Sequence, residues 1–176
     1  MEDDPSFIVL DKEEFDRKME NGVYPYTMTS SDRYTNPASF DYRIYSELSH
    51  ILEDRSGEYT LLDIASSSGE PLRETANRLE EETGTELRPV ALDVKKKMME
   101  KCYEEGNAEP VTGLGQELPF RDNSIDLVVS SQLNLKDNFM EEVVDEIDRV
   151  MKPEGYAVLS TGYVLEEDNY QGVHHG

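Results

Sequence analysis

The sequence predicts a doubly wound α/β fold, in which helices cover both faces of a mostly parallel sheet. Three observations predict it. From Thr60 onward, short apolar runs alternate with stretches of helical periodicity, as they do in βαβ units. The first run passes through Asp63 and breaks into very small residues that end at Gly69, which is typical of a strand leading into a ligand-binding turn. The second run also ends in an acid, Asp93.

The apolar runs predict five strands. They span residues 61–64, 89–93, 110–112, 125–130 and 155–160. Between the third and fourth strands, the sequence Asp122-Asn123-Ser124 is a cluster of turn-forming residues. Residues 119–124 are therefore predicted to form a surface loop.

Helices are predicted between these strands. They span residues 71–83, 94–105 and 138–151. Pro71 suits a first helical turn, and Gly84 and Gly106 suit the positions just after helix ends. The apolar residues of the third helix recur every three or four positions and form one stripe: Phe139, Val143, Val144, Ile147, Val150 and Met151. The sequence Lys152-Pro153-Glu154-Gly155 ends this helix.

The first 58 residues differ in character from the rest. Residues 40–52 place apolar side chains at helical spacing and predict a helix over a face or an edge of the sheet. For Tyr42 and Tyr45, core packing is favoured over a role in a lid, whereas Tyr34 is the better candidate for a lid over the ligand. We therefore expect a leader, residues 1–58, and an α/β domain, residues 59–176, in one compact unit.

The chain is strongly acidic. Thirty-nine Asp and Glu residues against 17 Lys and Arg residues give a formal net charge of −22. Because the acids are spread along the whole chain, we expect a solvated acidic surface, which suits proteins that work at high salt. A halophilic source and an ordinary acidic protein both fit this composition. Direct binding to nucleic-acid phosphates is disfavoured, since the charges repel each other.

Composition also bounds location and metal chemistry. Cys102 is the only cysteine, so the chain can form no intrachain disulfide and no cysteine-rich zinc site. His50 stands alone and His174-His175 has too few companions to predict a metal site. No stretch reaches the roughly 18–20 apolar residues of a membrane helix, and the acidic N-terminus lacks the features of a signal peptide. We therefore predict a cytoplasmic protein without a membrane anchor or a bound metal.

Three segments are predicted to meet beyond the carboxyl ends of the strands, where open α/β sheets bind ligands. They are the turn at residues 65–69, Asp93, and residues 113–117. An acid at the end of the second strand is placed to accept hydrogen bonds from ribose hydroxyls. The alternative for Asp93 is a solvent-facing acid at a strand end, and the alternative for Asp63 is a capping role that holds the turn together.

Four segments carry a resemblance. Residues 61–69 read Leu-Leu-Asp-Ile-Ala-Ser-Ser-Ser-Gly, and residues 91–94 read Ala-Leu-Asp-Val and are followed by Met98. Residues 117–128 read Glu-Leu-Pro-Phe-Arg-Asp-Asn-Ser-Ile-Asp-Leu-Val, and residues 146–155 read Glu-Ile-Asp-Arg-Val-Met-Lys-Pro-Glu-Gly. In this order they resemble the motifs of the class I S-adenosylmethionine-dependent methyltransferases of the small-molecule type. The resemblance implies the Rossmann-like fold of that family.

The first motif of that family is a strand followed by Asp-x-Gly-x-Gly-x-Gly. Asp63 and Gly69 match it, while Ala65 and Ser67 take the places of the first two glycines. The resemblance implies that the cofactor is S-adenosylmethionine. It also implies a pose, with the methionine end at Asp63, Ala65, Ser66, Ser67 and Gly69, the ribose on Asp93, and the adenine near Val94, Gly115 and Gln116.

Methyl transfer asks little of the protein beyond an in-line approach of the acceptor, so a general base is optional. The residues after the fourth strand are expected to face the acceptor. Gln132 or Asn134 is expected to orient it, with Tyr34 as a further candidate. Ser130, at the end of that strand, is counted with the cofactor site.

Two departures from the family pattern stand out. Leu114 occupies the place where the family often has an acid that binds the adenine amino group, so adenine specificity is left to Gln116 or to backbone groups. The chain also ends about 15 residues after the fifth predicted strand, whereas the family normally continues through a helix and a final antiparallel hairpin. We therefore expect a sheet edge that is open or covered by a partner, either a second copy or another protein.

Two functions stay in contention. The first is a methyltransferase that uses S-adenosylmethionine and acts on an unidentified acceptor. The second is a catalytically degenerate methyltransferase-fold protein, which binds the cofactor without turnover or serves as a non-catalytic partner subunit. A nicotinamide dehydrogenase is disfavoured, because the turn lacks a Gly-x-Gly-x-x-Gly pattern.

Overall fold

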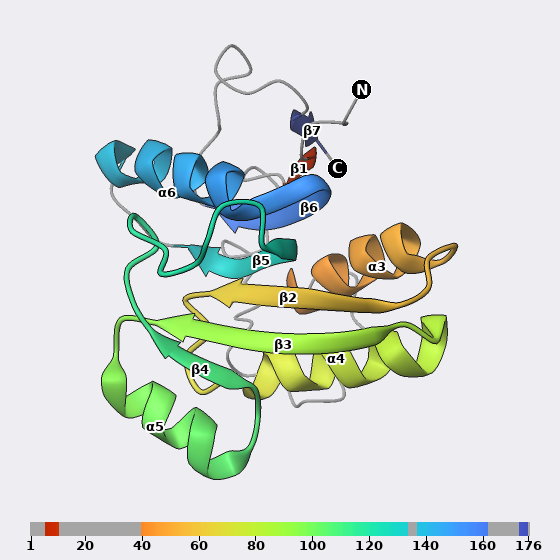
Figure 1. Cartoon of the computed structure of the whole chain (residues 1–176), viewed down its shortest axis with the longest axis horizontal. Coiled ribbons are helices and arrows are strands. Elements are labelled where there is room, and N and C mark those ends of the chain that lie inside the picture. Colours follow the sequence, from red (N-terminus) through yellow and green to blue (C-terminus); the bar gives the residue numbers. More distant parts are fainter. Residues whose placement is uncertain (1–5, 11–39, 134–136, 162–172, 176) are drawn as a thin grey trace, which may run out of the picture.

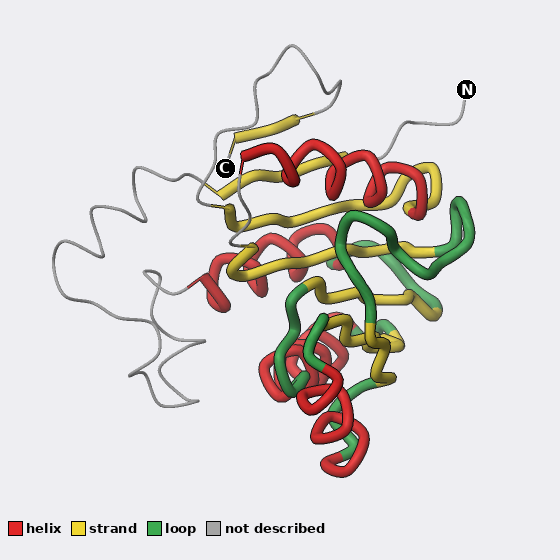
Figure 2. The backbone as a smooth tube through the Cα atoms, turned by 90° about the vertical axis from the view of Figure 1, so that its left-hand side faces the viewer, coloured by secondary structure: helices red, strands yellow, loops and turns green. Residues whose placement is uncertain are grey.

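A parallel sheet lies between two layers of helices, as the sequence predicts (Figure 1; Figure 2). The computed structural model describes residues 6–10, 40–133, 137–161 and 173–175, and the side chains of residues 43–130 and 141–159. Tyr34 and Asn134, which we predicted to lie near the methyl acceptor, fall outside the described residues.

From Phe40 to Thr161 the elements follow one another as predicted, and the short strand at Val173–His175 after them was not predicted. The strands are β1 (Ser6–Leu10), β2 (Glu58–Ile64), β3 (Glu86–Asp93), β4 (Glu109–Thr112), β5 (Ile125–Leu133), β6 (Met151–Thr161) and β7 (Val173–His175). The helices are α3 (Phe40–Leu52), α4 (Glu70–Thr83), α5 (Lys96–Glu105) and α6 (Asp137–Val150). Helices α4 and α5 end before Gly84 and Gly106, as predicted, and both glycines have the left-handed conformation that is common in helix caps.

The strand order is β4-β3-β2-β5-β6-β1-β7, and every neighbouring pair is parallel. From β2, the chain moves outward through β3 to β4, and then returns to place β5 on the other side of β2. The direction of winding therefore reverses between β2 and β5. In such a sheet, the carboxyl ends of the strands on either side of the reversal are where ligands bind.

One edge of the sheet differs from the expectation. We expected the edge beyond β6 to be open or covered by a partner, but β1 pairs with β6 along its whole length, with Ser6 opposite Tyr156 and Leu10 opposite Ser160. Strand β6 is therefore not the edge of the sheet. Our expectation counted only strands after Thr60, and a partner at the edge stays a prediction. Strand β7 then pairs with β1, so the leader and the C-terminal segment both extend the sheet.

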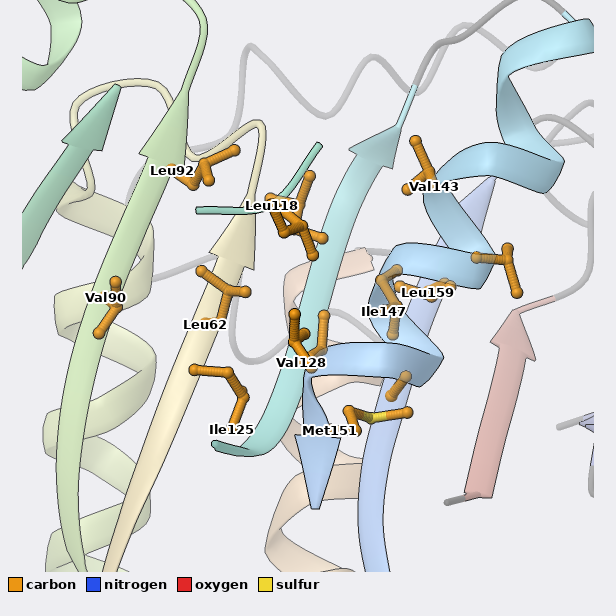
Figure 3. Close-up of a cluster of buried hydrophobic side chains, with 14 residues drawn as sticks. Leu62, Val90, Leu92, Leu118, Ile125, Val128, Val143, Ile147, Met151 and Leu159 are labelled. Carbon is orange, nitrogen blue, oxygen red and sulfur yellow. The ribbon is translucent and has the colours of Figure 1, made fainter. Parts of the chain in front are cut away.

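Helix α6 covers one face of the sheet. The predicted apolar stripe is buried at each of its described positions on α6, from Val143 to Val150, and its last residue, Met151, is buried at the start of β6. Figure 3 shows this side of the core, where α6 meets side chains from the centre of the sheet. The residues that pack there include Leu62, Val90, Leu92, Leu118, Ile125, Val128, Ile147 and Leu159.

Helices α3, α4 and α5 cover the other face. Alternate residues of the central strands turn to the two faces, so Leu61 and Leu127 pack on this side while Leu62 and Val128 pack against α6. Tyr45 of α3 packs against this second cluster, and its hydroxyl donates to Glu82 of α4, which agrees with the favoured core role of this tyrosine.

No helix among the described residues is long and apolar enough to cross a membrane.

Candidate functional site

The turn after β2 has an unusual backbone. Its φ angles are 64° at Ala65, 53° at Ser67 and 72° at Gly69. These are the three positions at which the methyltransferase motif has glycine, and positive φ is the conformation that glycine adopts most easily. The chain therefore keeps the geometry of a glycine-rich turn with two residues that are not glycine. A left-handed conformation costs an L-residue about 1–2 kcal/mol.

Backbone hydrogen bonds hold this turn against the neighbouring strand and helix. The Ser66 N–H donates to the carbonyl oxygen of Leu92 at the end of β3, at 3.0 Å. The side-chain amide of Asn107 donates to the carbonyl oxygen of Ser68 at 2.8 Å. Asn107 is buried just after α5 and was missed by sequence reasoning, because a lone Asn beside a helix end indicates only a turn.

The end of the turn is packed tightly. A Cβ atom built on Gly69 would lie 2.8 Å from the sulfur of Cys102, which is buried in α5. Burial raises the pKa of the Cys102 thiol above its ordinary value. Gly69 is thus required both by its φ angle and by the lack of space around it.

Asp93 links the turn to the start of α5. Its Oδ2 accepts the Ser67 N–H and its Oδ1 accepts the Lys95 N–H, each at 2.9 Å. The residue is 9% exposed, so it is no solvent-facing acid. An ionised carboxylate has about four acceptor positions, and the two backbone bonds use one on each oxygen. Each oxygen of Asp93 can therefore accept one further hydrogen bond.

Two apolar side chains flank this site. Val94 follows β3 and Leu114 follows β4, and they are 58% and 50% exposed. The Gly113 N–H donates to the carbonyl oxygen of Asp93 at 3.2 Å, which brings the segment after β4 beside the end of β3. Gly115 is buried in this segment, where an added Cβ would lie 3.2 Å from Val143 of α6. Gln116 is half-buried next to it.

The remaining predicted site residues lie at the ends of β2 and β5. Asp63 is buried in β2. Ser130 is fully buried in β5, and its hydroxyl donates to the carbonyl oxygen of Ile64 at 2.8 Å, so it ties the two strands together at the point where the winding reverses. Gln132 also lies on β5, but its side chain is outside the described part of the chain.

A cluster of charged side chains outside the site holds the loop at residues 118–120, which follows the site in the chain. Glu146 of α6 accepts the Leu118 N–H at 2.7 Å, while Arg149 donates to the carbonyl oxygens of Leu118 and Phe120 at 2.9 and 3.0 Å. The bonds to Arg149 lower the pKa of Glu146. The sequence shows the Glu-x-x-Arg pattern, but it does not show the partners of these side chains, Leu118 and Phe120, which lie about 30 residues earlier in the chain.

Two further polar residues make structural contacts. Asp126 of β5 accepts the Thr60 N–H of β2 at 2.9 Å and pairs with Lys152 of β6 at 2.8 Å, so it links three strands. His50 is exposed and pairs with Glu53, which lies just after the end of α3. Within the ranges that the structure describes, no group of three or more His, Cys, Asp or Glu side chains is arranged to hold a metal ion.

Comparison with known proteins identifies the family. A family profile described as "Methyltransferase domain" matches residues 62–159, more than half of the chain. The chain belongs to this methyltransferase family. No curated protein matches the chain significantly.

Solved structures agree with this methyltransferase fold. A "putative sarcosine dimethylglycine methyltransferase" from Galdieria sulphuraria is 20% identical, with a TM-score of 0.54, over 83% of this chain and 57% of its own. A "putative methyltransferase from antibiotic biosynthesis pathway" from Anabaena variabilis is 24% identical, with a TM-score of 0.51, over 69% of this chain and 45% of its own. The methyltransferase-family chain thus spans about half the length of these two proteins and shares their fold.

Proposed function

We propose that this protein is an S-adenosylmethionine-dependent methyltransferase, which transfers a methyl group to an acceptor that is still to be identified. One observation carries the proposal: the turn after β2 has positive φ angles at all three motif positions and is bonded to Asp93 at the end of β3. This turn follows β2, beside the point where the winding of the sheet reverses, and that is where an open α/β sheet binds its ligand.

The residues of the site fit this cofactor. Asp93 has one unused acceptor position on each carboxylate oxygen, which suits the two hydroxyls of a ribose. The exposed side chains of Val94 and Leu114 offer apolar surface to an adenine ring, beside Gly115 and Gln116. The methionine end is proposed to lie at Asp63 and the turn formed by Ala65, Ser66, Ser67 and Gly69, with Ser130 nearby.

The chain contributes binding and orientation. When bound, S-adenosylmethionine would supply a methyl group that its positively charged sulfur activates for transfer. The protein must then hold the acceptor in line and keep water out, which accounts for most of the rate in such a transfer. We propose that Gln132 or Asn134, with Tyr34 from the leader, orients the acceptor.

Calorimetric titration with S-adenosylmethionine tests the proposal. It is carried out at low salt and at molar salt, because salt screens the repulsion among the acidic side chains that give the net charge of −22. We expect binding, and we expect Asp93→Asn to weaken it at least tenfold, since the uncharged amide is a poorer acceptor for ribose hydroxyls. Glu154→Gly, far from the site, should bind as wild type does. Absence of binding at both salt concentrations would rule the proposal out.

A second candidate is a methyltransferase-fold protein that binds the cofactor without turnover, or that acts as a non-catalytic subunit. The side chains of Ala65 and Ser67 favour it, because they add a methyl and a hydroxymethyl group on the exposed side of a turn that the motif leaves bare. In that case a second copy or another protein would bind at the sheet edge, where β7 is the last strand. Size-exclusion chromatography with light scattering tests self-association; a monomer at high concentration would exclude a homodimer.

A further inference from the structure

Ser67 has a strained backbone and an exposed side chain, and it lies in the candidate site. Its φ angle is 53°, and its side chain is exposed. The geometry of the turn requires positive φ here, but glycine would meet that requirement without strain. What serine adds over glycine is a hydroxyl group, and the location of that hydroxyl indicates its use.

The hydroxyl of Ser67 has a weak partner. It donates to the sulfur of Met98, in the first turn of α5, at 3.7 Å. A thioether sulfur is a poor acceptor, so a ligand oxygen can replace it at little cost. The backbone N–H of the same serine is already fixed on Asp93 Oδ2 at 2.9 Å. The backbone of Ser67 is therefore fixed next to the carboxylate of Asp93, while its hydroxyl contacts only the first turn of α5 among the interactions described.

Asp93 by itself can meet only part of the hydrogen-bonding capacity of a ribose diol. Its two oxygens can accept one hydroxyl proton each, but they cannot donate to the oxygen atoms of those hydroxyls. Ser67 supplies a group that both donates and accepts. Because the hydroxyls of a diol are neighbours, a diol bound by Asp93 lies within reach of the serine attached to that carboxylate.

We propose that Ser67 is a specificity-determining residue for the ribose, and that its hydroxyl and the carboxylate of Asp93 together bind the 2′,3′-diol of the cofactor. This inference rests on the proposed function, since it deepens the assignment of the ribose to Asp93. Ligand binding moves the Ser67 hydroxyl from the sulfur of Met98 to a hydroxyl of the ribose. Nucleosides that lack one hydroxyl of the diol lose this contact.

Binding measurements test the assignment without requiring catalysis. S-adenosylhomocysteine and its 2′-deoxy and 3′-deoxy analogues are titrated calorimetrically into wild type and Ser67→Ala. Alanine retains the strained φ and removes only the hydroxyl, so the fold is unchanged. We expect Ser67→Ala to weaken binding of S-adenosylhomocysteine about three- to tenfold, the worth of one hydrogen bond. We expect no such loss for the analogue that lacks the hydroxyl bound by Ser67.

Two controls separate structure from recognition. Ser67→Gly removes the hydroxyl and the strain together, and Glu154→Gly relieves the same kind of strain in a turn remote from the site. Ser67→Gly should bind S-adenosylhomocysteine as weakly as Ser67→Ala, or more weakly, while Glu154→Gly should bind it as wild type does. Melting temperatures confirm that each variant is folded.

The outcomes are distinct. If wild type binds S-adenosylhomocysteine and Ser67→Ala binds it equally well, the ribose assignment of Ser67 is wrong while the proposed function stands. The assignment is also wrong if Ser67→Ala loses the same factor with both deoxy analogues, because the hydroxyl then contacts another part of the ligand. If wild type binds neither S-adenosylmethionine nor S-adenosylhomocysteine, the proposed function fails and the assignment fails with it.

Discussion

Two turns of this protein show two reasons for a glycine. In the turn after β2, Ala65 and Ser67 have positive φ and are exposed, while Gly69 has positive φ and is buried against Cys102. In the irregular stretch of β6 between Met151 and Tyr156, which we count as the second turn, the order is similar. Glu154 has a φ of 65° and is exposed, while the next residue is a buried glycine.

That glycine, Gly155, has no positive φ. A Cβ atom there would lie 2.8 Å from the carbonyl oxygen of Lys152 and 3.1 Å from that of Asp126, so it is required by space alone. In these two turns, glycine occupies the positions where atoms crowd the Cα, because a clash with fixed atoms is costly. At the exposed positions other residues adopt positive φ, since strain of about 1–2 kcal/mol is tolerable. Gly84 and Gly106 show that glycine also occurs in this chain where the φ angle alone favours it.

The largest expected effect follows from the space around Gly155. Gly155→Ala should lower the free energy of unfolding by about 3 kcal/mol, because the added methyl group meets fixed backbone oxygens that cannot move without disturbing β5 and β6. Urea denaturation monitored by circular dichroism measures it. Ala substituted at the neighbouring Glu154 is the matched control and should change stability little. If both variants lower the free energy of unfolding equally, crowding at the Cα is not what requires glycine at residue 155.

Gly69→Ala should destabilise by about 2 kcal/mol, since it adds φ strain and a contact with the sulfur of Cys102. The control is Gly84→Ala, whose φ of 74° is nearly the same but which has no atom within 4 Å of the added Cβ. Gly84→Ala isolates the strain, and the difference between the two variants measures crowding. Combining Gly69→Ala with Cys102→Ala should remove that difference; if it persists, the sulfur is not its cause.

A third connection, the loop at residues 118–122, is held by ionised side chains of α6, which predicts a pH dependence. Among them is Glu146, whose pKa Arg149 holds below its ordinary 4.5. A lowered folded-state pKa contributes stability above the unfolded pKa, and this stability is lost as the pH falls through the folded pKa. Glu146→Gln should therefore lower the melting temperature by a few degrees at pH 7, with the difference from wild type shrinking below about pH 4.

The control for this pH dependence is Glu104→Gln on the exposed end of α5. It should change the melting temperature little at any pH. A Glu146→Gln variant with the same deficit at pH 3 and at pH 7 would show that lost packing, rather than lost charge, accounts for the effect.

The smallest expected effect is a gain. Ala65→Gly relieves about 1–2 kcal/mol of strain, but glycine has about 0.4–1 kcal/mol more entropy to lose on folding. We therefore expect a net stabilisation of about 0–1 kcal/mol, measured by urea denaturation, and the same for Glu154→Gly. If Ala65→Gly clearly destabilises the protein while Glu154→Gly does not, the methyl group of Ala65 makes a stabilising contact that the side chain of Glu154 lacks.

Much of the fold could be predicted because its signals are local. The bounds of α3 were predicted without error, and the glycine caps of α4 and α5 follow from turn chemistry that needs only neighbouring residues. The strand β1 was missed for the opposite reason. Its sequence Phe7-Ile8-Val9-Leu10 is too short to assign by periodicity, and its partner β6 lies nearly 150 residues away.

The candidate site divides in the same way. The sequence by itself determined that a strand ends at Asp63 and Ile64 before a small-residue turn, and that a second acid, Asp93, ends the next strand. These are properties of residues close together in the chain, where apolar runs and small residues specify strands and turns.

Only the tertiary structure decided how the parts meet. It placed the Ser67 N–H on Asp93, the sulfur of Cys102 under Gly69, and Arg149 on the loop after the site. The physical reason is that a hydrogen bond or a close contact depends on where two distant segments lie once the core has packed, and no local pattern of side chains encodes that distance.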